Sequence, residues 1–225
     1  MFRQSLYVIL DGKPRLVTLR NYTIEDTEAL IDIQRDCFPP PFPSELWWNA
    51  EQIANHARIF PEGALCAEME GVLIGSMTAL IIQTDAYEKH LPWDKATDNG
   101  YIRTHHPDGD TLYVVDISVR PDYRKCGIGK VMMQAMYAVV VHLGLKRLLG
   151  GARMPGYGRA AAQYSIEQYV EGIMEGKWHD PVVSFLLRCG RTPVAIVPDY
   201  LEDEESRNNG LLMEWRNPFI TNCRR

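Results

Sequence analysis

Residues 115–130 read VDISVRPDYRKCGIGK, and this stretch decides the fold of the 225-residue chain. The apolar run 112–119 predicts a buried strand, which Pro121 ends. Gly127 and Gly129 then predict a tight turn that opens into a helix. The first turn of a helix offers unpaired N–H groups and the positive end of the helix dipole, and glycine lets a ligand approach the backbone. The segment is therefore suited to bind a pyrophosphate.

The flanking sequence predicts a mixed α/β order within one domain over residues 1–225. Period-two apolar runs between turn signals predict strands over residues 6–10, 15–20, 64–69, 72–82, 112–119, 145–150, 192–197 and 211–215. Capping residues and period-3.6 runs predict helices over residues 23–37, 44–58, 127–143, 165–174 and 180–189. Ser44 is the expected cap of the second helix. The segments 38–43 (FPPPFP) and 83–110 are the expected long connections, and long connections are often functional.

Composition narrows the functional class. The net charge of −5 argues against a nucleic-acid binder, which normally carries a basic patch. No apolar run reaches the roughly 18 residues that a membrane span requires. The five cysteines are widely spaced without a CxxC pair, and no secretory signal is evident. We therefore expect reduced thiols, no metal site and a cytoplasmic location.

The whole string is more specific than its glycines, and it resembles the acetyl-CoA-binding motif of the GNAT superfamily. That motif is [RQ]-x-x-G-x-[GA] after a strand ending in V-x-P, and it is matched by Arg124, Gly127 and Gly129 after Val119 and Pro121. The resemblance implies a GNAT-like fold with a mixed, mostly antiparallel central sheet flanked by helices. It also implies an N-acetyltransferase that moves an acetyl group from acetyl-CoA to a primary amine acceptor by direct transfer.

The resemblance assigns two stretches to the cofactor. The amides of residues 125–130 are expected to hold the pyrophosphate, and the strand end 117–119 is expected to pair with the pantetheine arm. The implied cofactor-binding residues are Ile117, Ser118, Val119, Arg124, Lys125, Cys126, Gly127, Ile128, Gly129 and Lys130.

Asp116 is the candidate general base. A period of two places it on one face of the strand with Val114 and Ser118. Burial in an apolar strand would raise the pKa of its carboxyl group toward the range useful for catalysis. The alternative is a structural aspartate that accepts hydrogen bonds from loop amides.

The general acid is harder to assign. In the family that the chain resembles, a tyrosine often lies four residues before the glycine that ends the later helix, but here that position is Leu186. Tyr157 and Tyr164, in the preceding segment, are the candidate substitutes. The alternative is that each is a packing or surface tyrosine.

The acceptor side is least specified. A small-molecule amine or an amino-acid-like acceptor would bind near the loops 38–43 and 83–110. The segments CFPPPFP and GGARMPGY also resemble the GNAT domain found fused ahead of carbon–nitrogen hydrolase domains in bacteria. That leaves a second hypothesis, a catalytically weak acyl-CoA-binding module that docks onto a partner such as an amidase. A homodimer stays open as well.

Overall fold

The computed structural model describes residues 2–84 and 91–220, and its centre is an eight-stranded sheet in the order β1-β2-β3-β4-β5-β6-β8-β7. Every neighbouring pair is antiparallel except β5 and β6, which run parallel. The strands are β1 (Arg3–Leu10), β2 (Lys13–Asn21), β3 (Ala64–Met69), β4 (Val72–Ile82), β5 (Thr111–Val119), β6 (Arg147–Ala152), β7 (Thr192–Val197) and β8 (Gly210–Arg216). The expected mixed, mostly antiparallel sheet is confirmed.

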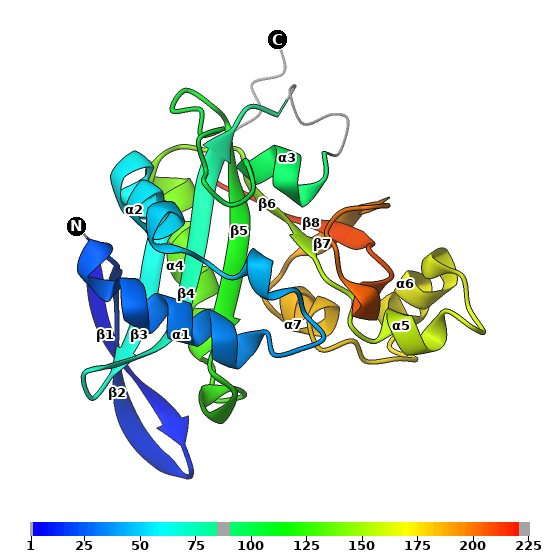
Figure 1. Cartoon of the computed structure of the whole chain (residues 1–225), viewed down its shortest axis with the longest axis horizontal. Helices are drawn as coiled ribbons and strands as arrows, with labels where there is room; N and C mark the ends of the chain where they lie inside the picture. The colour runs from blue at the N-terminus through cyan, green and yellow to red at the C-terminus, as the bar shows by residue number, and fades with distance from the viewer. Residues whose placement is uncertain (1, 85–90, 221–225) are drawn as a thin grey trace.

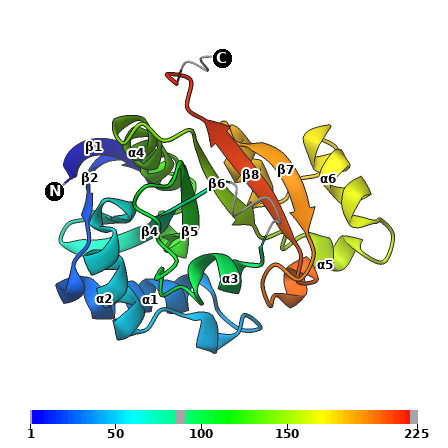
Figure 2. The ribbon, with the colours of Figure 1, turned by 90° about the horizontal axis from the view of Figure 1, so that it is seen from above.

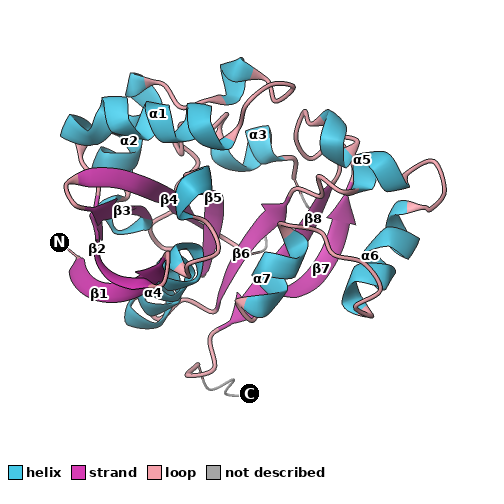
Figure 3. Ribbon diagram, turned by 90° about the horizontal axis from the view of Figure 1, so that it is seen from below, coloured by secondary structure: helices cyan, strands magenta, loops and turns pink. Residues whose placement is uncertain are grey.

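Helices cover both faces of this sheet (Figures 1 and 2). They are α1 (Thr27–Cys37), α2 (Ala50–Ile59), α3 (Trp93–Thr97), α4 (Ile128–His142), α5 (Tyr157–Ala160), α6 (Ile166–Met174) and α7 (Val183–Arg188). Helices α1, α2 and α3 lie on one face, and α4 and α7 lie on the other (Figure 3). Helices α5 and α6 lie at the end of the molecule beyond β7 and β8, in both Figure 1 and Figure 2.

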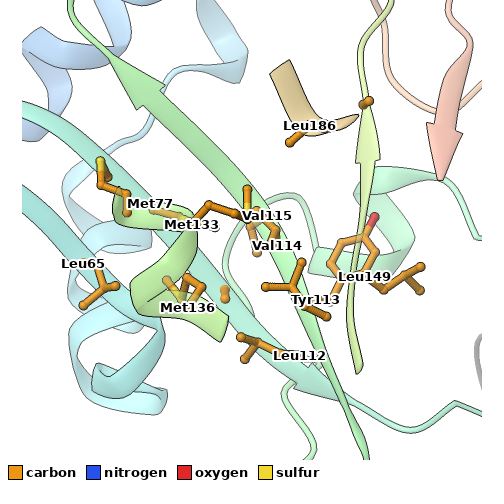
Figure 4. Packing of buried hydrophobic residues seen from close by; sticks show 14 of the residues in the cluster. Leu65, Met77, Leu112, Tyr113, Val114, Val115, Met133, Met136, Leu149 and Leu186 are labelled. Atoms are coloured by element: carbon orange, nitrogen blue, oxygen red, sulfur yellow. The ribbon is translucent and has the colours of Figure 1, made fainter. Parts of the chain in front are cut away.

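The hydrophobic core lies on both faces of the sheet, against α1 and α2 on one side and against α4 on the other. Met133 and Met136 of α4 point toward Leu65 of β3 and Met77 of β4, and all four side chains are buried (Figure 4). The predicted helix 127–143 agrees with α4 to within one residue at each end. None of the helices in the described part of the chain is long and apolar enough to cross a bilayer.

The second predicted helix begins later than expected. Residues Ser44–Leu46 form only a short 3-10 turn, and α2 begins at Ala50. Asn49 is the true N-cap: its side chain accepts from the Gln52 amide at 2.9 Å, and the Gln52 side chain accepts from the Asn49 amide at 2.8 Å. This reciprocal capping box satisfies two amides, which a Ser44 cap could not do because the backbone after Leu46 is extended.

The long connection before β5 is held to the rest of the fold. It contains α3, which the sequence did not predict, and the Trp93 amide donates to the Tyr200 carbonyl at 2.8 Å. The His106 amide donates to the Ile81 carbonyl at 2.8 Å, and the Ile81 amide donates to Nδ1 of His105 at 3.1 Å. The described part of the connection therefore packs as structure and is not a free loop.

Strands β5 and β6 pair over only three positions, residues 111–113 with residues 147–149. Strand β5 continues to Val119 along β4, while β6 continues to Ala152 along β8. The two central strands therefore diverge after Tyr113 and Leu149. We call the resulting opening between residues 114–119 and residues 150–152 the splay.

Candidate active site

A β-bulge sets which way the end of β5 faces. Ala79 of β4 lies opposite Val114, but its neighbour Thr78 lies opposite Asp116, so β5 carries one extra residue at Val115. Residues directly opposite in an antiparallel pair share a face of the sheet. Val114 and Asp116 therefore point to opposite faces, which corrects the expectation that they share one. The bulge keeps Asp116 and Ser118 together on the face of α1.

Helix α1 supplies the partner of Asp116. Nε2 of Gln34 donates to Oδ2 of Asp116 at 3.1 Å and lies 3.4 Å from Oγ of Ser118. Oγ of Ser118 donates to the same carboxylate at 3.0 Å. Burial raises the pKa of Asp116 to about 6, although hydrogen bonds from Ser118, Gln34 and the Ile117 amide act in the opposite direction. The carboxyl group can therefore exchange a proton near neutral pH.

A buried polar chain supports the strand opposite Asp116. Nε2 of His56 lies 2.6 Å from the Gly100 carbonyl, so this nitrogen must donate and Nδ1 must accept. The hydroxyl of Tyr22 accordingly donates to Nδ1 at 3.0 Å, and the hydroxyl of Thr78 donates to Tyr22 at 2.7 Å. Burial lowers the pKa of His56 to about 4, which keeps the ring neutral. The chain ends at a carbonyl, so it positions β4 and does not carry protons away from the site.

The glycine-containing turn presents backbone amides to solvent. Lys125 has φ +64° and Gly127 has φ +95°, both in the left-handed region, and Gly127 is the N-cap of α4. The first intrahelical bond is donated by Val131, so the amides of residues 125–130 have no hydrogen-bond partner among the described residues, as is usual at a helix start. A Cβ atom on Gly127 would meet nothing within 4 Å. The open space at the positive end of a 15-residue helix is where an anion would bind.

The surroundings of Gly127 and Gly129 differ, so a side chain would be unfavourable at the two positions for different reasons. A Cβ atom on Gly129 would lie 3.1 Å from the Phe185 ring of α7, so the small residue at 129 lets α4 pack against α7. This packing gives Gly129 a structural role beside the expected approach of a ligand, which stays a prediction. Cys126 is half-buried against the core, and its thiol donates to the Tyr123 carbonyl at 2.8 Å. Ile128 is 1% exposed, so its side chain belongs to the core.

Three positively charged side chains lie in the turn or directly before it. Arg124, Lys125 and Lys130 are exposed. Nε of Arg124 donates to the Val119 carbonyl at 2.8 Å, which ties the turn to the end of β5. The same side chain hydrogen-bonds Cys37, whose pKa burial raises to about 11. The C-terminal end of α1 thus lies beside the turn.

The end of β5 is paired on one side only. Residues 117–119 pair with β4, while the described pairing with β6 stops at Tyr113. Nε1 of Trp93 donates to the Val115 carbonyl at 3.0 Å and so occupies one backbone group next to the splay. The backbone of Ile117 and Ser118 can therefore pair with an extended ligand that enters the splay.

The structure does not bring Tyr157 and Tyr164 to Asp116. Tyr157 belongs to α5 and is buried against Tyr169, with ring centroids 5.4 Å apart. Tyr164 follows α5, is 39% exposed and packs against Trp178 at 4.5 Å. Helix α5 follows β6 closely and lies on the β7–β8 side of the molecule in Figures 1 and 2. These ring contacts support the packing alternative for both tyrosines, and their role as general acid stays a prediction.

The structure places two buried side chains, Leu186 and Arg191, near the splay. Leu186 of α7 is 3% exposed and lies between β5 and β6 in Figure 4. Position 186, where related enzymes often carry the tyrosine that acts as general acid, therefore holds a buried apolar side chain. Arg191, which follows α7, is 2% exposed and reaches the Gly150 carbonyl at 2.9 Å. Sequence reasoning missed Arg191 because a single arginine before a strand gives no local signal of burial.

Three tryptophans near the loops 38–43 and 83–110 make contacts that hold the fold together. Trp48 and Trp93 are buried and stack with ring centroids 6.2 Å apart. Nε1 of Trp47 donates to the Phe38 carbonyl at 3.0 Å. The guanidinium of Arg153 lies 4.9 Å from the Phe42 ring centroid, which joins the proline-rich loop to the end of β6. The loop is thus fixed beside the splay.

Known proteins are similar to this chain in sequence and in fold. Residues 27–164 match the family model described as the acetyltransferase (GNAT) family. The chain is 56% identical over 216 residues to the "Uncharacterized N-acetyltransferase YkwB" of Bacillus subtilis (strain 168), covering 96% of both chains.

A second relative is longer. The chain is 39% identical over 202 residues to the "Probable hydrolase YhcX" of the same organism. The match covers 89% of this chain but only 39% of that protein.

Among solved structures, the fold is similar to that of the "GphF GNAT-like decarboxylase in complex with isobutyryl-CoA". The TM-score is 0.76, the identity is 23%, and the match covers 88% of this chain and 98% of the other. At that identity the likeness concerns the fold alone. The sheet, the family match and the close relative together show that the chain belongs to the acetyltransferase (GNAT) family.

Proposed function

We propose that this member of the family transfers an acetyl group from acetyl-CoA directly to a primary amine. One observation carries the proposal: the unpaired amides of the turn 125–130, the half-paired strand end 117–119 and the carboxylate of Asp116 all lie along one continuous segment. Pyrophosphate at the turn and pantetheine along the strand would bring a thioester to the level of Asp116.

The assigned residues would have three separate roles: binding the pyrophosphate, pairing with the pantetheine arm and accepting a proton. The amides of residues 125–130 would hold the pyrophosphate, with Arg124, Lys125 and Lys130 adding positive charge. The backbone of residues 117–119 would pair with the pantetheine arm. Asp116 would take a proton from the amine, since its pKa of about 6 leaves it ionised at neutral pH and able to act as a base. The acceptor would enter between the proline-rich loop and α1.

A second function is favoured by one observation, the leucine at position 186. An apolar residue there cannot protonate the leaving thiolate. The alternative is an acyl-CoA-binding module that docks onto a partner such as an amidase, a reading that the longer hydrolase-named relative also suggests. A homodimer is compatible with either function.

Calorimetric titration with acetyl-CoA and with CoA tests the proposal first. We expect micromolar binding of both, followed by release of free CoA from acetyl-CoA when a panel of primary amines is added. Binding without release for any amine would favour the docking module. Absence of binding to the folded protein would overturn the assignment of the turn.

A further inference from the structure

Arg191 is a buried cation without an acidic partner. Its Nη2 donates to the carbonyls of Gly150 and Met213. Its Nε has no hydrogen-bond partner among the described residues, and Arg191 makes no ion pair within that part of the chain. A charge withdrawn from water without a counter-charge is strongly unfavourable, so this arrangement requires an explanation.

The ionisable groups that act on Arg191 are three phenols and one thiol. They are Tyr137 of α4, Tyr113 of β5, Tyr200 after β7 and Cys189 at the end of α7. Burial raises the pKa of Tyr200 to about 12 and also raises the pKa of Tyr137 and Cys189. Burial lowers the pKa of Arg191 to about 10, which still leaves it charged at neutral pH. The surroundings therefore offer polar contact but no negative charge.

A structural role accounts for only part of this side chain. Met213 lies opposite Pro193, which has no N–H group, so Nη2 of Arg191 supplies a donor that the sheet lacks. A neutral amide side chain could serve the same carbonyls. The positive charge and the unpaired Nε are not explained by the sheet.

The place of Arg191 points to a ligand. Gly150 follows the last paired position of β5 and β6, so it lies at the closed end of the splay. A Cβ atom on Gly150 would lie 3.0 Å from the Val114 carbonyl and 3.2 Å from Nη2 of Arg191, so glycine leaves the guanidinium next to β5. Val114 precedes Asp116 by two residues, across the bulge at Val115. That is within reach of the reacting end of a CoA compound lying in the splay.

We infer that Arg191 forms an anion subsite at the closed end of the splay, and that it takes the negatively charged end of a CoA compound. The anion is either the thiolate of CoA or a carboxylate on the acyl chain. The inference rests on the proposed CoA site. A thiolate would be stabilised there without a proton donor, which fits the apolar Leu186. A carboxylate would make a short dicarboxylic acyl-CoA a better donor than acetyl-CoA.

The two anions are distinguished by calorimetry with three ligands between pH 6 and pH 9. The ligands are CoA, acetyl-CoA and succinyl-CoA. If the thiolate is bound, CoA affinity rises on the order of a hundredfold across this range, because a thiol with pKa near 8.5 must release its proton to the buffer. Acetyl-CoA has no free thiol and corrects for the titration of Asp116. If a carboxylate is bound, succinyl-CoA binds at least about tenfold more tightly than acetyl-CoA at every pH.

Variants assign the effect to the guanidinium. Arg191→Met removes the charge, and Arg188→Met removes an exposed arginine three residues earlier as a matched control. We expect Arg191→Met to abolish the preference for the anionic ligand while keeping acetyl-CoA binding, and Arg188→Met to change neither. Arg191→Lys keeps the charge and should keep part of the preference, so it serves if Arg191→Met does not fold.

The outcomes separate this inference from the proposed function. If wild-type protein binds acetyl-CoA but shows neither the pH dependence nor the preference for succinyl-CoA, the inference is wrong and the proposed function stands. A preference that persists in Arg191→Met likewise contradicts it. If no CoA compound binds the folded wild-type protein, the proposed function and the inference fall together.

Discussion

The glycine-containing turn 125–130 and the splay both adjoin the end of β5, but they are built in different ways. The turn is made of consecutive backbone amides between Lys125 and Lys130, and its geometry follows from local conformation, above all φ +95° at Gly127. The splay is an opening between two strands, and the side chains near it come from distant segments: Gln34 of α1, Asp116 of β5 and Arg191 after α7. A site built of backbone can be read from a motif, whereas a site built of side chains depends on how the elements pack.

The largest expected effect breaks the turn. Gly127→Glu should weaken CoA binding by about 100-fold or more, since it forces a side chain into a left-handed conformation and sets a negative charge beside the phosphates. Titration with CoA measures the loss. Gly144→Glu is the matched control, because Gly144 has φ +66°, has nothing within 4 Å of a Cβ atom and lies at the opposite end of α4. Equal losses in both variants would mean that the turn is not the phosphate site.

The next effect separates chemistry from binding. Asp116→Asn should lower the acylation rate about 100-fold while changing CoA affinity less than threefold, because the carboxylate acts on the amine and not on the phosphates. The wild-type rate should rise with pH through about 6, as Asp116 loses its proton. Rates and affinities measured on the same samples decide the question. Matching losses of rate and affinity would indicate a structural aspartate.

A smaller effect tests how α1 tunes the base. Gln34→Leu removes a donor to the Asp116 carboxylate, so the pKa of Asp116 should rise and the midpoint of the rate–pH profile should move upward by roughly 1 pH unit. The profile at saturating donor measures this shift. Asp32→Asn, on an exposed position of the same helix, should leave the midpoint unchanged. An unmoved midpoint in Gln34→Leu would show that the amide does not set the proton affinity of Asp116.

The smallest effect concerns the tyrosines of the distal segment. Tyr157→Phe and Tyr164→Phe should each change the rate by less than about twofold, because both rings are engaged in packing against Tyr169 and Trp178 and phenylalanine keeps that packing. Steady-state rates at several pH values test this. A loss of tenfold or more with the alkaline limb of the profile removed would restore either tyrosine as the general acid.

Sequence patterns predicted the elements well wherever local signals and packing agreed. The hairpin β3–β4 has the predicted bounds because Glu70-Gly71 adopts the positive φ values of a tight turn between two apolar runs. The start of α2 was wrong because Ser44 and Asn49 are both good caps, and only the packing of Trp48 into the core selects the second. Helices α3 and α5, of five and four residues, are too short to show a period.

The sequence by itself determined the order of the strands and of the longer helices, the glycine-containing turn and the candidate base Asp116, because these depend on residues close together in the chain. Only the tertiary structure decided which way Asp116 faces, since a bulge opposite Thr78 inverts the period of β5. It also decided that the rings of the two candidate tyrosines pack against Tyr169 and Trp178, and that Arg191 lies beside the splay. The physical reason is that a one-residue shift in pairing reverses every later side chain, and that burial of a charge depends on neighbours from all of the surrounding elements.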